Sequence, residues 1–261
     1  MLHGIFGRGR NWSAVATALC AVRPDVGVEL VDLRLHGGSQ GFAPPHDLDA
    51  AAGDLEALLH DAGRPVVAIL GHSFGGKVAL ALAARDPAGV RQTWVIDASP
   101  SENAPEGNTW KLTRLLRALP ARFPTRDDAV RGIIAGGLDE TTARWMATNL
   151  VSDGGDYVWG FDLDAIEMLL QDYFARDLWS VIEKRGRSEI LFVKATESVA
   201  LSDADEARLA RAAAADTGVT LIRMKGGHWI QAEDPAGVVR LLAEKLPRDG
   251  FASGGRDLPP Q

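Results

Sequence analysis

The chain has 261 residues, of which 46% are hydrophobic and 24% charged, and its formal net charge is −7. This is the composition of a globular domain, and its acidic balance argues against non-specific binding to nucleic acid or anionic membranes. Cys20 is the single cysteine, which excludes an internal disulfide and a multi-cysteine zinc site. Residues 1–10 hold no apolar run long enough for a signal peptide, and no stretch of about 18 apolar residues predicts a membrane span. We therefore expect a cytoplasmic protein.

Short runs rich in Val, Ile and Leu predict buried strands, and apolar residues at helical spacing predict helices between them. In chain order the expected elements are a helix at 12–23, a strand at 27–33, a helix at 48–61, a strand at 65–70, a helix at 75–85, strands at 93–97 and 190–194, a helix at 205–216, a strand at 219–224 and a helix at 235–246. This alternation predicts an α/β fold with an open, mostly parallel sheet flanked by helices.

The segment between Asp97 and Ile190 interrupts this alternation, because it shows no clear strand. Helical patterns cover residues 112–119, 141–150 and 163–179 instead. We expect a core of residues 1–99 and 187–246 and a helical cap of residues 100–186 inserted at the strand ends; a separate helical domain is the alternative. Residues 247–261 carry Gly, Pro and charge without periodicity and are expected to be a disordered tail.

Residues 71–75 read Gly-His-Ser-Phe-Gly, a G-x-S-x-G pattern between a predicted strand and a predicted helix. In this context the serine sits on a tight turn that lifts its hydroxyl above the sheet, while the glycines let the backbone pack closely. The helix N-terminus places N–H groups beside a developing oxyanion. The pattern predicts that Ser73 is a nucleophile and that the N–H of Phe74 is an oxyanion donor.

The same segment comes within one residue of a phosphate-binding loop, because residues 71–78 read G-x-x-x-x-G-K-V. That loop needs a hydroxyl after its lysine to hold magnesium, and Val78 has none. Lys77 is therefore interpreted as a residue of the first helical turn.

Two more glycine-containing motifs lie near the ends of the chain. Residues 3–7 (HGIFG) precede a helix, and the N–H of Ile5 is the expected second oxyanion donor, with that of Phe6 as the alternative. Residues 225–229 (KGGHW) follow the last predicted strand. Acyl transfer needs a base that takes the serine proton and returns it to the leaving group, and His228 is the best candidate of the six histidines.

Together, HGIFG, VDLRLHGGS (31–39), GHSFGGKVAL (71–80) and GGHW (226–229) resemble the α/β-hydrolase superfamily. With VIDASP (95–100) they resemble its serine esterase branch, which includes the bacterial YbfF-type esterases and the mitochondrial ABHD11-type hydrolases. The resemblance runs from about residue 2 to about residue 246. It implies an α/β-hydrolase fold with a helical cap and specifies no substrate.

The third member of a catalytic triad is an acid that orients the base. The superfamily usually places it after the strand at 190–194, but Ser198 stands at that position. Asp97 gives a better account, because it ends the strand after the nucleophile helix and the resembling branch includes this arrangement. Glu197 and Asp203 are the alternatives.

Members of the superfamily have one or two strands before the HG motif, whereas here only Met1-Leu2 precede it. Either the true start lies upstream of Met1, or the N-terminal edge strands are missing. Missing strands would leave the oxyanion loop poorly anchored and an edge unpaired. Asp32 and Arg34 are interpreted as residues that stabilise the following loop.

These motifs predict hydrolysis of a small-molecule carboxylic ester or thioester through an acyl-enzyme, without a metal or organic cofactor. Phe6 and Trp229 are expected to contact the substrate. Six aromatic residues of the expected cap either line an acyl pocket or pack the cap onto the sheet: Trp110, Trp145, Trp159, Phe161, Phe174 and Trp179. The alternatives are carbon–carbon bond hydrolysis or cofactor-free perhydrolysis by the same triad, and a non-catalytic ligand-binding protein. A monomer or homodimer without nucleic-acid or membrane partners is expected.

Overall fold

The computed structural model describes residues 1–184, 186–215 and 217–248. A 3-10 turn at Gly9–Trp12 leads into the helices and strands, which follow in this order: α1 (Ser13–Val22), α2 (Leu48–Asp61), β1 (Ala68–His72), α3 (Phe74–Ala83), β2 (Gln92–Ile96), α4 (Gly107–Ala118), α5 (Arg126–Ala135), α6 (Glu140–Ala147), β3 (Leu150–Asp153), β4 (Asp156–Trp159), α7 (Leu163–Ala175), α8 (Trp179–Glu183), β5 (Glu189–Ala195), α9 (Asp203–Ala214), β6 (Val219–Met224), α10 (Ile230–Glu233) and α11 (Pro235–Lys245).

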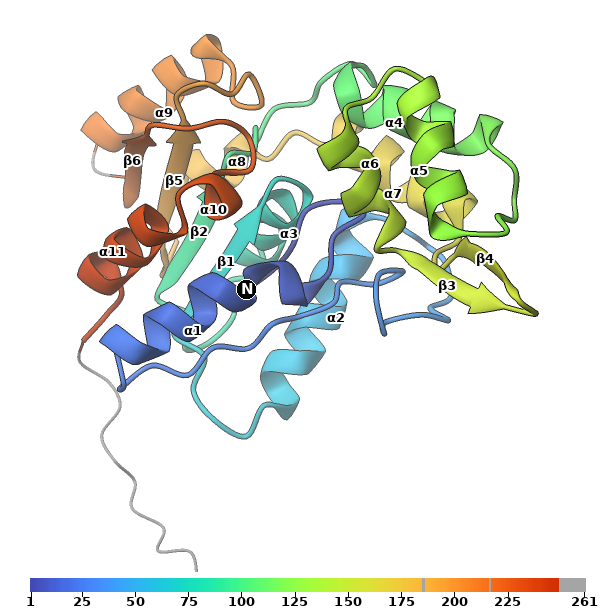
Figure 1. Ribbon diagram of the computed structural model, residues 1–261. Helices are drawn as coiled ribbons and strands as arrows, with labels where there is room; N and C mark the ends of the chain where they lie inside the picture. Colours follow the sequence, from blue (N-terminus) through green and yellow to red (C-terminus); the bar gives the residue numbers. More distant parts are fainter. Residues whose placement is uncertain (185, 216, 249–261) are drawn as a thin grey trace, which may run out of the picture.

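Four strands form one parallel sheet in the order β1-β2-β5-β6 (Figure 1). In this register Gly71 of β1 lies opposite Val95 of β2, which lies opposite Phe192 of β5. The carboxyl ends of all four strands therefore meet at one edge of the sheet, where α/β folds of this kind bind their ligands. The predicted α/β fold with a mostly parallel sheet is confirmed.

Helices bury both faces of this sheet. Trp94 and Ile96 of β2 pack in one core cluster with residues of α1 and α11, which lie side by side in Figure 1. Val95, between them, packs in the other cluster with residues of α2, α3 and α9. Successive side chains of a strand point to opposite faces, so each strand contributes to both clusters. Each large side chain buried in this way stabilises the fold by about 1.5–3 kcal/mol.

The segment between β2 and β5 is largely helical, and α4 to α7 gather to one side of the sheet (Figure 1). The expectation that it holds no strand is wrong, because β3 and β4 pair as an antiparallel hairpin. Gly154 and Gly155 form its two-residue turn with positive φ angles of 61° and 93°, as hairpins of this type require. Both strands have four residues and are mostly half-buried or exposed, so they lack a long apolar run. The proposed core and cap boundaries stay a prediction.

The strand expected at 27–33 does not form. In this stretch of the described chain only Val31 makes a β-bridge, with Leu2. Leu2 bridges Gly71 of β1 as well, and its N–H donates to the carbonyl of Leu70 at 2.7 Å. The backbone before the HG motif is thus held on both sides at a single residue. Pairing this short forms no continuous strand.

Side chains anchor the loop after Leu2, which corrects the expectation that it is poorly anchored. The N–H of Leu33 donates to Nε2 of buried His3 at 3.0 Å, and that of Phe6 donates to Nε2 of buried His36 at 3.1 Å. Asp32 accepts from the N–H groups of residues 9 and 38 at 2.7 and 2.8 Å, and Arg34 pairs with a carboxylate of α2 at 2.6 Å. The loop-stabilising interpretation of Asp32 and Arg34 is confirmed.

The expected tail falls, from residue 249 on, outside the described residues. Within the described ranges, no helix has the length and apolarity that crossing a bilayer requires.

Three buried histidines make the stability of the fold pH-dependent. Burial lowers the pKa of His3 to about 3 and that of His36 to about 4, and it holds the pKa of His72 well below its usual value. The unfolded chain protonates these groups near pH 6.5, so it binds more protons than the folded protein as the pH falls below that value. We expect the free energy of unfolding, measured by urea denaturation, to fall by roughly 1–2 kcal/mol per histidine between pH 7 and pH 5.

His60→Gln is the matched control, because the His60 side chain is 88% exposed. This substitution should leave the pH dependence of the unfolding free energy unchanged. Equal unfolding free energies at pH 7 and pH 5 would contradict the expectation.

Candidate active site

Ser73 occupies the turn between β1 and α3 in a strained backbone conformation, with φ 53° and ψ −118°. A Cβ atom at Gly71 would lie 2.0 Å from the carbonyl oxygen of Gly75, and one at Gly75 would lie 2.6 Å from that of His3. Neither position has room for a side chain, which is why the G-x-S-x-G pattern needs both glycines. The turn directs Ser73 into a cavity at the carboxyl edge of the sheet.

Asp97 and His228 meet at the same edge, although they follow the non-adjacent strands β2 and β6. Nδ1 of His228 lies 2.7 Å from Oδ2 of Asp97, whose side chain is fully buried. Oδ1 of Asp97 accepts from the N–H of Ala195, at the end of β5, at 3.2 Å. The carboxylate is thus fixed by the intervening strand and leaves Nε2 of His228 as the nitrogen that is available to a nucleophile.

The alternative acids lie apart from this pair. Glu197 is exposed on the loop after β5, and Asp203 is fully exposed beside Lys194, with 3.5 Å between Oδ1 and Nζ. The geometry therefore favours Asp97 as the partner of His228.

The two oxyanion candidates, Ile5 and Phe74, line the cavity together with Ser73. Phe74 is the first residue of α3, so its N–H has no carbonyl one turn earlier to bind. The N–H of Phe6 already donates to His36, and the carbonyl of Phe6 accepts from Nδ2 of Asn149, just before β3, at 2.8 Å. Of the two early N–H groups, that of Ile5 is therefore the better donor.

His72 has a role that its place in the sequence did not reveal. It is fully buried, and its Nε2 lies 2.7 Å from the carbonyl oxygen of His228, to which it donates. Nδ1 faces Nε2 of Gln231 at 3.4 Å. Burial, with the neighbouring His228 second, holds its pKa well below the usual value, so the neutral ring positions the backbone of His228. No local sequence signal marks a contact across so many residues.

Lys77 lies in the first turn of α3, as interpreted from the sequence, but it is buried rather than solvated. Nζ donates to the carbonyl oxygens of Ser101, after β2, and of Tyr173, in α7, at 2.7 Å each. Burial lowers its pKa to about 8. The lysine thus ties α7 and the loop after β2 to α3, the helix that follows Ser73.

The cavity at Ser73 has a volume of about 240 Å³ and also includes His228. Its other walls come from α7, the loop after β2, α4 and α9, with Leu170, Tyr173, Phe174, Asn103, Glu106 and Asp205 among the lining residues.

Neither Phe6 nor Trp229, the expected substrate contacts, is among the described residues that line it. Phe6 is buried against Phe161, and Trp229 packs against Trp145 of the cap, with ring centroids 5.3 and 4.9 Å apart. Among the cap aromatics that the sequence singled out, Phe174 alone of the described residues lines this cavity.

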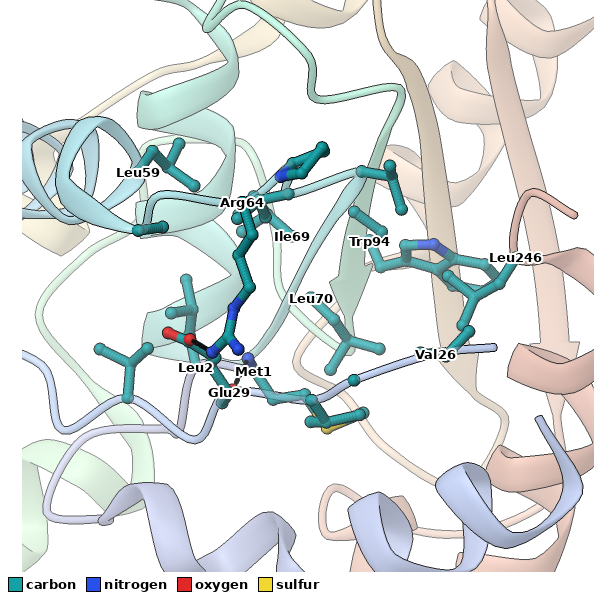
Figure 2. Close-up of a pocket in the computed structure, with 18 of the residues that line it drawn as sticks. Met1, Leu2, Val26, Glu29, Leu59, Arg64, Ile69, Leu70, Trp94 and Leu246 are labelled. Carbon is teal, nitrogen blue, oxygen red and sulfur yellow. Dashed lines mark hydrogen bonds and ion pairs between the residues drawn. The ribbon is translucent and has the colours of Figure 1, made fainter. Parts of the chain in front are cut away.

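A larger cavity of about 470 Å³ lies beside β1, toward the amino ends of the strands (Figure 2). Leu70, Trp94 and Leu246 form apolar walls, and Arg64 and Glu29, which form an ion pair, also line it. None of the candidate catalytic residues is among the described residues that line it. Ser73 and His228 line the smaller cavity instead.

A model of the alpha/beta hydrolase family matches residues 1–241. The sn-1-specific diacylglycerol lipase ABHD11 of Danio rerio is 27% identical over 243 residues, which are 90% of this chain and 73% of that protein. The Mus musculus protein of the same name is 31% identical over 170 residues; the match covers 63% of this chain and only 55% of that relative's length. A putative esterase/lipase of Haemophilus influenzae is 26% identical, and the match covers 94% of this chain and 81% of that protein.

Solved structures share the fold. A marine microorganism esterase superposes with a TM-score of 0.80 at 24% identity and covers 93% of this chain and 92% of its own. The thioesterase domain from the curacin biosynthetic pathway superposes with a TM-score of 0.65 at 20% identity, covering 92% and 89%. At these identities the likeness concerns the fold alone.

The contact between Asp97 and His228 can be tested by comparing substitutions of Asp97 and of the alternative acid Glu197. Asp97→Asn should lower kcat/KM for a p-nitrophenyl ester by roughly 10²- to 10⁴-fold, because the amide favours the wrong imidazole tautomer. Glu197→Gln should leave kcat/KM within about twofold of wild type, because surface substitutions away from the site have small effects. A large loss in Glu197→Gln alone would assign the acid to the late loop instead.

Proposed function

Because the chain belongs to the alpha/beta hydrolase family, we propose that it is a serine hydrolase that cleaves a carboxylic ester or thioester through an acyl-enzyme. One observation carries the proposal: Ser73, on its strained turn, shares a small cavity with His228, whose other ring nitrogen binds the buried Asp97 at 2.7 Å. The relatives named lipase or esterase support the same class of reaction.

In the first half of the proposed reaction, Ser73 Oγ attacks the carbonyl carbon while Nε2 of His228 takes its proton. Asp97 keeps Nδ1 protonated and stabilises the imidazolium that forms. The N–H groups of Ile5 and Phe74 donate to the tetrahedral oxyanion. Loss of one such donor typically destabilises the transition state by about 2.7–4 kcal/mol. The imidazolium then protonates the leaving alcohol or thiol, and the acyl group stays on Ser73.

In the second half, water enters and His228 removes its proton as the water oxygen attacks the acyl carbon. The same two N–H groups bind the second oxyanion, and the imidazolium returns its proton to Ser73 Oγ as the ester bond breaks. His228 accepts and returns every proton in both halves, so Ser73, His228, Asp97 and the two N–H groups suffice for the proposed cycle.

The shape and charge of the cavity favour a short acyl group without a negative charge. Its volume of about 240 Å³ is below the roughly 300–1,000 Å³ of pockets for drug-sized ligands. Glu106 and Asp205 line it, and neither Lys nor Arg is among the described residues that do so. A carboxylate on the acyl chain would be repelled there with no cation to offset it.

Ser73→Ala tests the nucleophile. We expect kcat for p-nitrophenyl butyrate to fall by about 10⁴-fold or more, as it does when a triad serine is removed, with an unchanged circular dichroism spectrum. Wild-type turnover in the folded alanine variant would rule the proposed mechanism out.

The cavity volume gives a prediction on chain length. Hydrolysis of p-nitrophenyl acetate and butyrate should exceed that of the palmitate ester by at least about tenfold in kcat/KM, because a cavity of about 240 Å³ cannot enclose a sixteen-carbon chain without displacing its walls, which typically costs about 1–3 kcal/mol. The p-nitrophenyl hemisuccinate should react more slowly than the butyrate of similar length. A preference for palmitate would show that the cap opens to a larger acyl site.

A further inference from the structure

Asn149 lies between α6 and β3, yet its side chain makes two contacts with the loop that begins at the HG motif. The residue is buried, with 4% of its surface exposed. Its Nδ2 donates to the carbonyl oxygen of Phe6 at 2.8 Å, and its Oδ1 accepts from Nε of Arg8 at 3.2 Å. The amide thus holds the loop immediately after Ile5, the proposed oxyanion donor.

The turn at this point has a strained backbone. The N–H of Gly7 donates to the carbonyl oxygen of Gly4 at 2.9 Å, which closes a four-residue turn. Ile5 and Phe6 are its central residues. Phe6 has a φ of 58°, a left-handed value that residues other than glycine keep only where their surroundings hold them. Relaxation to a negative φ would rotate the peptide that joins Phe6 to Ile5.

Two side chains oppose this relaxation by binding the two backbone polar groups of Phe6. The N–H donates to Nε2 of buried His36 at 3.1 Å, and the carbonyl oxygen accepts from Asn149. Asn149 is itself fixed by its backbone. Its N–H donates to the carbonyl oxygen of Met146, and its own carbonyl oxygen accepts from the N–H of Gly160, at 2.9 Å each. The amide is therefore a rigid support for the turn.

We propose that Asn149 is a positioning residue for the oxyanion hole, which holds Phe6 in the left-handed conformation and thereby keeps the N–H of Ile5 in place for the oxyanion. The inference rests on the proposed function. Asn149 is not among the described residues that line the cavity, so it acts through the loop rather than on the substrate. A donor that is held in place beforehand needs no rearrangement when the oxyanion forms.

The two contacts of Asn149 need one donor and one acceptor. The carbonyl oxygen of Phe6 can only accept a hydrogen bond, and Nε of Arg8 can only donate one. An amide supplies both functions, whereas an ionised carboxylate of the same shape only accepts. Asn149→Asp therefore keeps an acceptor for Arg8 and removes the hydrogen bond to Phe6.

Asn149→Asp should lower kcat for p-nitrophenyl butyrate by about 10- to 100-fold, because losing an oxyanion donor outright costs about 10²- to 10³-fold and displacing one costs less. KM should change by less than about threefold, since the substitution lies outside the cavity wall. Titration of Ser73 with a fluorophosphonate counts the intact sites, so that kcat is expressed per labelled serine.

A trifluoromethyl ketone tests the oxyanion hole itself. In the adduct, Ser73 Oγ bonds to the ketone carbon as the Oγ proton moves to His228, and the ketone oxygen becomes an oxyanion. The adduct resembles the transition state, so its Ki should rise in Asn149→Asp by the same factor by which kcat/KM falls. A loss of folded protein alone would leave Ki unchanged.

Asn108→Asp is the matched control, because it makes the same change at an exposed residue of α4 that is not among the described residues lining the cavity. It should keep the wild-type kcat and Ki. Asn149→Ala also removes the donor to Phe6 and carries the same expectation as Asn149→Asp if the aspartate variant does not fold.

Three results would overturn the role of Asn149. They are a wild-type kcat per labelled serine in the folded Asn149 variant, equal losses in Asn149→Asp and Asn108→Asp, and an unchanged Ki beside a lowered kcat. If the wild-type protein itself shows no labelling of Ser73, the proposed function fails instead.

Discussion

The candidate site depends on the hydrogen bond between Asp97 and His228, because it joins the ends of two strands that are not neighbours. Asp97 follows β2 and His228 follows β6, with β5 between the two strands. The carboxylate spans this gap by accepting from the N–H of Ala195, at the end of β5, with one oxygen and contacting His228 with the other. An acid in this position needs no carboxylate in the loop after β5, which explains why Ser198 can stand there.

The histidines divide between scaffold and proposed chemistry according to burial. His3 and His36 accept backbone N–H groups of the HG loop, and His72 donates to the carbonyl of His228. Burial keeps all three neutral, so they act as fixed hydrogen-bonding groups. The side chain of His228 is 33% exposed and lines the cavity with Ser73, where the proposed mechanism uses it as the base. One residue type thus fills both roles.

Much of this arrangement could be predicted from the sequence, where the signal is local. Ser73 and His228 stand in glycine-containing turns next to predicted strands, and Asp97 ends a buried apolar run. Contacts between distant segments leave no such signal, so the hydrogen bond from Lys77 to α7 emerges only in three dimensions. The β3–β4 hairpin was missed because its half-exposed strands lack an apolar run.

A crystal structure of the protein after reaction with a fluorophosphonate tests the central claim most directly. The account predicts phosphorus bonded to Ser73 Oγ, with a phosphonyl oxygen within hydrogen-bonding distance of the N–H groups of Ile5 and Phe74. It also predicts that His228 keeps its contact with Asp97. An adduct on another residue, or a phosphonyl oxygen turned away from both N–H groups, would contradict it.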